Sequence, residues 1–281
     1  MILKLQKIET NNIENLKEQF LGFYLTPSLF KDNFFDIEQF EFDEINLDSL
    51  DFEKLQIHEK IPLGKRVERF FEFYILNSKR YDLMLKNIQI IKNKNTLGEI
   101  DFILFDNKNQ EYLHVELIYK FYIYEDRFKK ELQRYIGPNK DDSLIKKLDK
   151  LKTKQLPLLY KDEAKEYLKD IDFNNIKQKI CFKANLFFSN KNYNNNIEPF
   201  NKNCKKGLSL KYSDFIEDIN FKNLQYYVPH RFDWISNENI VKKWHSYKEI
   251  IDEIKQFIDL KKAPLLWIKD KNKINQYFIL W

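Results

Sequence analysis

The sequence predicts a protein of the α/β (α+β) class, with a mixed central sheet flanked by helices. Apolar residues in Gly64–Ser78 recur at helical spacing and give one apolar face. Gly98–Phe105 and Glu111–Tyr124 alternate as strands do, and the polar residues between them predict an antiparallel hairpin. Lys179–Ser189 reads as a further strand before an Asn-rich loop.

The chain divides into three predicted parts. Residues 1–55 form an N-terminal helical segment, residues 56–190 form the core, and residues 191–281 form an α/β extension continuous with the core. Asp141 or Asp142 is expected to cap a helix that Pro157 limits. The other expected elements are a helix carrying Leu144, Ile145, Leu148 and Leu151, strands at 88–91, 207–212 and 225–228, helices at 237–244 and 246–260, and a final strand or strand pair after residue 263.

The composition of the chain limits the classes of protein to which it can belong. The 281 residues are 43% hydrophobic and 16% aromatic, which suffices for a sizeable core and argues against disorder. Cys181 and Cys204 lack metal-ligand spacing, and no apolar stretch is long enough to span a membrane, so we expect a reduced cytoplasmic protein. The net charge of +5 is compatible with a nucleic-acid partner, although a solvated Lys-rich surface explains it equally simply. Oligomeric state stays open.

Two carboxylates in the predicted hairpin form the candidate metal site. If the turn is centred between Lys108 and Asn109, Asp101 lies opposite Glu116 on the neighbouring strand. Like charges placed opposite each other are destabilising unless a proton, a basic side chain or a cation neutralises them. Carboxylate oxygens suit Mg²⁺ or Mn²⁺, so this pair is the predicted metal site.

Exposure to solvent on the polar face of the hairpin is the competing interpretation of this pair. Two features weigh against it. The Glu116 strand is apolar on both faces, which predicts a central strand where a carboxylate needs a partner. Gly98 precedes the acidic strand and permits close backbone approach.

The segments GEIDFIL and HVELIYK resemble motifs II and III of the PD-(D/E)XK nuclease superfamily. The chain also resembles the bacterial family DUF1853 through five stretches between Pro62 and Trp234, namely PLGKRVERFFEFYI, GEIDFILFD, HVELIYKFY, YIGPNKDDSLIKKLDKL and VPHRFDWIS. The resemblance implies a restriction-endonuclease-like core made of a helix, a three-stranded antiparallel meander, a second helix and a further strand.

The resemblance also implies roles for single residues. Asp101 and Glu116 match the two metal ligands, and Glu68 matches an acidic residue near the metal, with Glu72 as its competitor. Ile118 stands where the superfamily has its lysine. Lys120 lies on the same strand face, but four residues of strand span about 13 Å. Lys120 is therefore a candidate catalytic residue that could contact a phosphate or, with a bulge in the strand, swing toward the metal.

Four further residues are candidate substrate contacts. His114 lies on the face of Glu116 and could act as a base or an additional ligand, although a histidine there is more commonly a satisfied core residue. Lys147, Lys150 and Gln155 lie on the Lys-rich helix, which offers a basic face for phosphates or merely a solvated one.

Three functions fit these residues. The first is a Mg²⁺-dependent phosphodiesterase acting on DNA, or less readily on RNA. The second is a nuclease fold that has lost cleavage and binds nucleic acid or a protein partner, which the displaced lysine favours. The third is a structural core in which lysines neutralise the carboxylate pair.

Overall fold

A computed structural model describes residues 13–31, 33, 37–58, 61–169, 171 and 176–281. The chain forms two compact units, each treated by itself. The central unit comprises Pro27–Ile45 and Tyr74–Lys206, and the terminal unit comprises the described residues of Met1–Thr26, Asn46–Phe73 and Gly207–Trp281. The sequence predicts three continuous segments, residues 1–55, 56–190 and 191–281. The two units do not test this division, which stays a prediction.

The central unit is built on four long strands in the order β2-β3-β4-β6. β2, β3 and β4 form an antiparallel meander, and β6 lies parallel to β4. Short strands add to this sheet, because β1 pairs with β6 and β5 pairs with β4. The bounds are β1 Glu38–Gln39, β2 Tyr81–Lys92, β3 Asn95–Asp106, β4 Glu111–Tyr124, β5 Tyr135–Ile136 and β6 Ile176–Phe188. β4 is therefore a central strand, as its apolar composition predicts.

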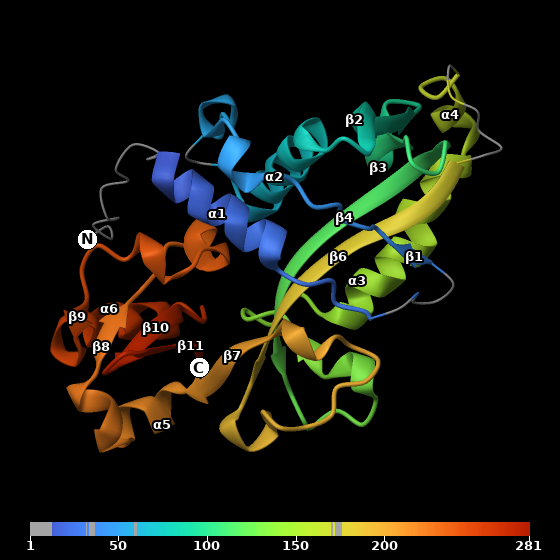
Figure 1. The fold of residues 1–281 in the computed structure, drawn as a ribbon. Coiled ribbons are helices and arrows are strands. Elements are labelled where there is room, and N and C mark those ends of the chain that lie inside the picture. Colours follow the sequence, from blue (N-terminus) through green and yellow to red (C-terminus); the bar gives the residue numbers. More distant parts are fainter. Residues whose placement is uncertain (1–12, 32, 34–36, 59–60, 170, 172–175) are drawn as a thin grey trace. The chain divides into compact units, whose positions relative to one another are not determined.

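One helical segment lies along a face of this sheet (Figure 1). It begins with α3 (Leu144–Lys150) and continues through a π-turn, Leu151–Gln155, and a 3-10 turn, Leu156–Tyr160, before α4 (Asp162–Lys165). Leucines of this segment pack against two groups of buried strand residues. The segment thus covers the face of the sheet that carries Glu116.

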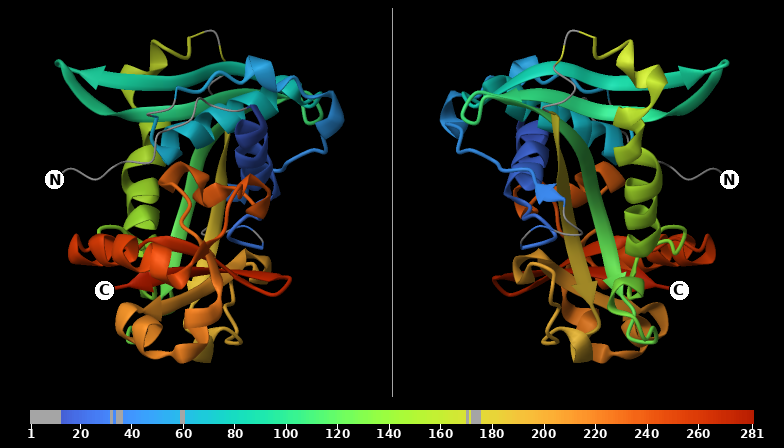
Figure 2. Two further views of the ribbon diagram at one scale, coloured as in Figure 1. Left: turned by 90° about the vertical axis from the view of Figure 1, so that its left-hand side faces the viewer. Right: turned by 90° about the vertical axis from the view of Figure 1, so that its right-hand side faces the viewer.

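The long strands separate into two pairs. The β3–β4 ladder runs from Asp106–Glu111 to Phe102–Val115. Beyond Phe102, β3 continues with β2 as its partner, while β4 continues beyond Val115 alongside β6. Figure 2 shows the β2–β3 hairpin crossing the direction in which β4 and β6 run. We call the point of separation the strand fork.

The terminal unit contains a second group of strands in the order β7-β11-β10-β8-β9. Helix α6 packs on one face through Ile250 and Ile254, within a buried apolar cluster. The bounds are α1 Ile13–Leu25, β7 Lys205–Lys211, α5 Tyr212–Glu217, β8 Gln225–Tyr227, β9 His245–Ser246, α6 Tyr247–Asp259, β10 Leu265–Asp270 and β11 Lys273–Leu280, with the first two residues of β7 belonging to the central unit.

Helix α2 (Leu63–Asn77) follows the predicted helix closely. Its apolar residues Val67, Phe70 and Phe71 are buried, and Phe70 contacts Phe20 of α1 edge-on. The α/β class, with a mixed sheet flanked by helices, is confirmed. Among the described residues, no helix combines the length and the apolar character needed to cross a membrane.

Several local predictions were wrong. Ser143, and not Asp141 or Asp142, caps α3, because its hydroxyl accepts the N–H of Lys146. Residues 237–244 hold only a 3-10 turn, Glu238–Ile240, and no longer helix. Ile145 is 38% exposed, so it does not join the apolar side of α3.

Two further elements differ in length from their predictions. The helical path does not stop at Pro157, because proline fits the first turn of the new 3-10 segment that begins at Leu156. The strand expected at 88–91 is the end of a longer β2. A bulge between Leu83 and Leu85 and the left-handed Asn87 interrupt the alternation of its first half.

Candidate metal and phosphate site

Asp101 and Glu116 lie at the strand fork. The predicted register is confirmed from Phe102–Val115 to Asp106–Glu111, and Asp101 and Glu116 are the next residues along each strand. Oδ2 of Asp101 accepts the backbone N–H of Leu117 at 2.9 Å. The Asp101 side chain therefore reaches across to the Glu116–Leu117 peptide of β4 at the point where the ladder ends.

Gly98 permits this fork to be packed tightly. A Cβ placed on Gly98 would lie 2.9 Å from Cδ2 of Leu158, closer than real Cβ contacts allow without a shift. The glycine therefore lets Leu158 of the 3-10 turn press against β3 just beyond Asp101, which is the close approach that the sequence predicts for Gly98.

Glu116 is fully buried, at 0% exposure. Its Oε1 lies 3.0 Å from Nε2 of His114, and its Oε2 accepts a short hydrogen bond from Nε2 of Gln155. A buried carboxylate is costly unless hydrogen bonds or charges compensate it. Side-chain nitrogens of His114 and Gln155 contact both oxygens and provide that compensation here, so the fold holds Glu116 in place.

Lys147 joins the network through Gln155. Nζ of Lys147 donates to Oε1 of Gln155 at 2.8 Å, and Gln155 donates in turn to Glu116. Burial lowers the pKa of Lys147, against the opposing pull of the Glu116 and Asp101 carboxylates. Lys147 is thus a half-buried cation within the field of both predicted metal ligands.

Lys120 is held by an acidic partner. Its Nζ donates to Oδ2 of Asp142 at 2.6 Å, and both side chains are about one-third exposed. Charges of Lys150 and Lys120 also lower the pKa of Lys147, so these cations lie within electrostatic reach of one another. Lys147 is connected to Glu116 through Gln155, whereas Lys120 is paired with Asp142.

Glu68 and Glu72 belong to the part of α2 assigned to the terminal unit. Glu68 accepts from Lys65 at 2.8 Å, and Glu72 accepts from Arg69 at 3.0 Å. Each pair is spaced as neighbours on one helix face, so these contacts are local to the helix. A role for either residue at the metal stays a prediction.

The donor set of the fork fits a hard divalent cation with few protein ligands. Within the described ranges, His, Cys, Asp and Glu form no group of three or more that could hold a metal ion. Mg²⁺ commonly takes one or two carboxylates and completes its shell with waters and phosphate oxygens. Each carboxylate oxygen has two acceptor positions, so Glu116 could bind a cation while keeping its hydrogen bonds.

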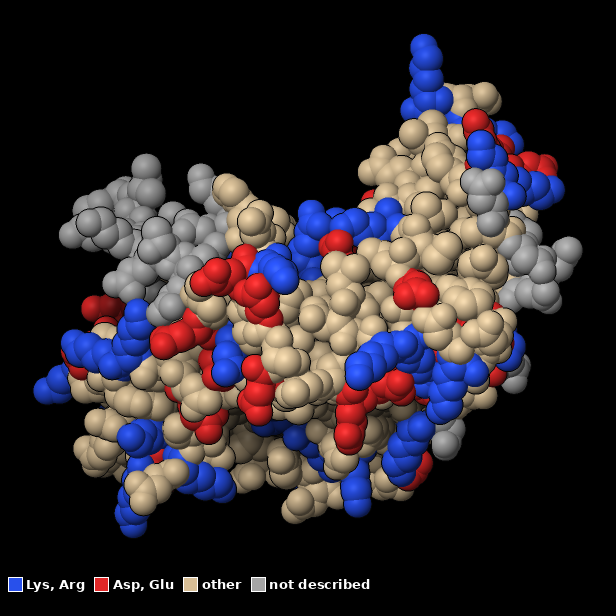
Figure 3. Space-filling model, turned by 45° about the horizontal axis from the view of Figure 1, so that its top comes forward, with Lys and Arg blue, Asp and Glu red and all other residues tan. Residues whose placement is uncertain are grey.

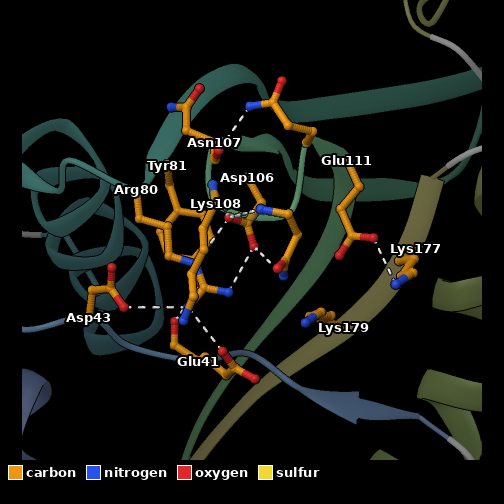
Figure 4. Close-up of polar contacts among 12 residues, drawn as sticks. Glu41, Asp43, Arg80, Tyr81, Asp106, Asn107, Lys108, Glu111, Lys177 and Lys179 are labelled. Carbon is orange, nitrogen blue, oxygen red and sulfur yellow. Dashed lines mark hydrogen bonds and ion pairs between the residues drawn. The ribbon is translucent and has the colours of Figure 1, made fainter.

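A second polar cluster braces the turn between β3 and β4 (Figure 4). Arg80 donates to Asp106 through Nε at 3.0 Å and through Nη2 at 2.8 Å, and its Nη1 donates to Glu41 at 2.9 Å. Asp106 is fully buried and also accepts the backbone N–H of Lys108. The cluster fixes the turn that sets the register of Asp101 and Glu116.

Gln178 is a site residue that sequence reasoning missed. Its amide nitrogen lies 2.9 Å from Nδ1 of His114. Gln178 precedes the predicted start of its strand at Lys179, whereas β6 begins at Ile176. A strand predicted to begin three residues earlier would have included Gln178.

The face shown in Figure 3 carries Lys and Arg interspersed with Asp and Glu. On the described part of this face, neither sign of charge forms a single continuous field. Lys147 is the lysine of the helical segment that joins the Glu116 network. The segment also carries Lys146, Lys150, Lys152 and Lys154.

The family model of DUF1853, described as a domain of unknown function, matches residues 37–277. The chain belongs to the DUF1853 family. The match includes the strand fork, the turn brace and the whole helical segment beside them. The predicted family is therefore confirmed for DUF1853. No curated protein and no solved structure matches the chain.

Proposed function

We propose that this DUF1853 protein is a metal-dependent nuclease that hydrolyses phosphodiester bonds, in DNA more readily than in RNA. One observation carries the proposal. Two carboxylates, those of Asp101 and Glu116, follow directly after the last β3–β4 residue pair, where two strand pairs separate, and a half-buried ammonium, Lys147, lies in the field of both.

The order of elements supports the same proposal. A helix, an antiparallel three-stranded meander, a second helix and a strand parallel to the last meander strand follow one another as α2, β2–β4, α3 and β6. This order agrees with that of the PD-(D/E)XK superfamily. The metal motif of that superfamily would correspond to the fork.

Asp101 and Glu116 would hold Mg²⁺ or Mn²⁺. Such a cation would polarise a scissile phosphate and lower the pKa of an attacking water. The hydrogen bonds to Leu117 N–H, His114 and Gln155 hold both carboxylates in fixed orientations before any ligand arrives. Lys147 would neutralise negative charge on the phosphate, since it carries the nearest ammonium of the network.

A catalytically impaired binding module is the second candidate. Ile118, at 2% exposure, occupies the position at which the superfamily has its lysine, and Lys120 is engaged by Asp142. Catalysis therefore depends on whether Lys147 can take the part of the missing lysine. A protein without that ability would still bind a cation and nucleic acid.

Nicking of supercoiled plasmid tests the nuclease proposal. We expect nicking by the wild type with Mg²⁺ or Mn²⁺, and none with EDTA. Asp101→Asn and Glu116→Gln should reduce it to background, because each removes an anionic ligand at nearly constant shape. Parallel reactions with RNA of the same length measure the preference.

Glu111→Gln is the matched control. Glu111 lies on the same strand as Glu116 but at the turn end, where it pairs with Lys177 at 2.7 Å. This variant should nick as the wild type does. Nicking that persists in Glu116→Gln contradicts the proposal, and metal binding with salt-sensitive DNA retention but no nicking establishes the binding module.

A further inference from the structure

The ring of His114 is held at both nitrogens by named partners. Nδ1 lies 2.9 Å from Nε2 of Gln178, and Nε2 lies 3.0 Å from Oε1 of Glu116. His114 is fully buried, at 0% exposure. The position of the ring hydrogen therefore depends on these two neighbours.

Gln178 fixes the direction of the first contact. The same Nε2 of Gln178 donates to the carbonyl oxygen of Leu156 at 2.7 Å. A backbone carbonyl can only accept, so the atom facing Leu156 and His114 is the amide nitrogen, which can only donate. Nδ1 of His114 must then accept, and the hydrogen of a neutral ring must sit on Nε2.

The opposite side of Glu116 is fixed by the same logic. An ammonium only donates, so the atom of Gln155 that faces Lys147 is Oε1, and its Nε2 is left to donate to Glu116. Each oxygen of Glu116 thus faces a neutral N–H group. Both donors hold the carboxylate in one orientation.

We propose that Gln178 and His114 are positioning residues that orient the Glu116 carboxylate as a metal ligand. The inference rests on the proposed function in one respect, which is that Glu116 binds the cation. Neither ring nitrogen of His114 can reach a metal unless it gives up a protein partner. His114 therefore acts through Glu116, and is neither a ligand nor a base. Partners of this kind fix the geometry and raise the affinity of a metal site.

The tautomer can be measured directly in the metal-free protein. Long-range ¹H–¹⁵N NMR correlations distinguish a protonated ring nitrogen from an unprotonated one. The chain has four histidines, so the His114 signals are assignable by comparison with a His114→Gln variant. We expect hydrogen on Nε2 and none on Nδ1. Hydrogen on Nδ1 in the wild type overturns the inference.

Gln178→Glu provides the inverse test. A carboxylate in place of the amide accepts instead of donating, so Nδ1 should become protonated while the side-chain volume stays the same. An unchanged Nδ1 would show that Gln178 does not set the ring and would overturn the inference. Far-UV circular dichroism and a thermal melt establish that the variant is folded.

Mn²⁺ titration at one fixed pH measures the consequence for the site. His114→Gln can still donate to Glu116, so its affinity should stay within about threefold of wild type, whereas His114→Asn is too short to reach Glu116 and should bind Mn²⁺ about 10–100-fold more weakly. Equal losses in the two variants, or no loss in either, contradict the positioning role. If the wild type binds no Mn²⁺, the proposed function fails, and the NMR result alone decides the inference.

Discussion

Nζ of Lys147 donates to Oε1 of Gln155 at 2.8 Å, which connects the ammonium to the buried Glu116 carboxylate through one amide. The connection spans eight residues of a continuous helical path, and it places a cation beside the acidic pair from a different element of the chain. Lys120, which lies on the strand of Glu116, is instead paired with Asp142.

Lys147 should matter more to cleavage than Lys120. We expect Lys147→Met to lower the plasmid nicking rate by about 100-fold, the size of effect seen when one preorganised charge-stabilising group is removed. Lys120→Met should lower the rate less, because the charge of Lys120 is already neutralised by Asp142. Rates measured at saturating Mg²⁺ compare the two, and a larger loss for Lys120 contradicts the assignment.

The turn brace should contribute strongly to stability. Asp106→Ala leaves the buried Arg80 without its bidentate partner, and removal of one member of such a pair costs about 3–5 kcal/mol of unfolding free energy. Urea denaturation at pH 7 measures this loss. Asp82→Ala, at an exposed position of β2, should change the unfolding free energy by less than about 0.5 kcal/mol. Similar losses in the two variants would show that Arg80 does not depend on Asp106.

Lys183 should give the protein a distinct alkaline pH dependence. Burial lowers the pKa of Lys183 from 10.5 to about 8. Between these two values the unfolded chain binds a proton that the folded protein has released, so folding gains stability as the pH rises through this window. Relative to Lys183→Met, the wild type should gain up to about 3 kcal/mol of unfolding free energy across the window.

Denaturant unfolding of the wild type and of Lys183→Met between pH 7 and pH 10.5 tests this expectation. The difference in unfolding free energy between the two proteins removes the contribution of all other titrating groups. A difference that stays constant with pH would contradict it. Lys183 Nζ lies 4.1 Å from the ring centre of Phe42, so a constant offset from the lost packing against this ring is expected in addition.

The sequence was most informative where periodicity is strong. The bounds predicted for β4, Glu111–Tyr124, agree with the structure, and the apolar face of α2 is buried as its spacing indicates. The register of the β3–β4 hairpin followed from the centre of its turn. This register is enough to place Asp101 and Glu116 directly after the last residue pair of the ladder.

Contacts between side chains distant in sequence were harder to predict. The Lys147–Gln155 bond depends on a helical path that continues through a π-turn, which a period of 3.6 residues does not reveal. The Gln178–His114 contact depends on the parallel register of β4 and β6, in which Gln178 lies beside His114. The Arg80–Asp106 pair joins the first residues of the meander to its second turn, and no local pattern marks it.

Diffraction from crystals soaked in Mn²⁺, with an anomalous difference map, tests the shared cation most directly. We predict a single strong peak at the fork, about 2.1 Å from an oxygen of Asp101 and from an oxygen of Glu116, with waters completing the octahedron. The same map from Glu116→Gln crystals should lack the peak. A wild-type map with no Mn²⁺ between these two carboxylates would contradict the account.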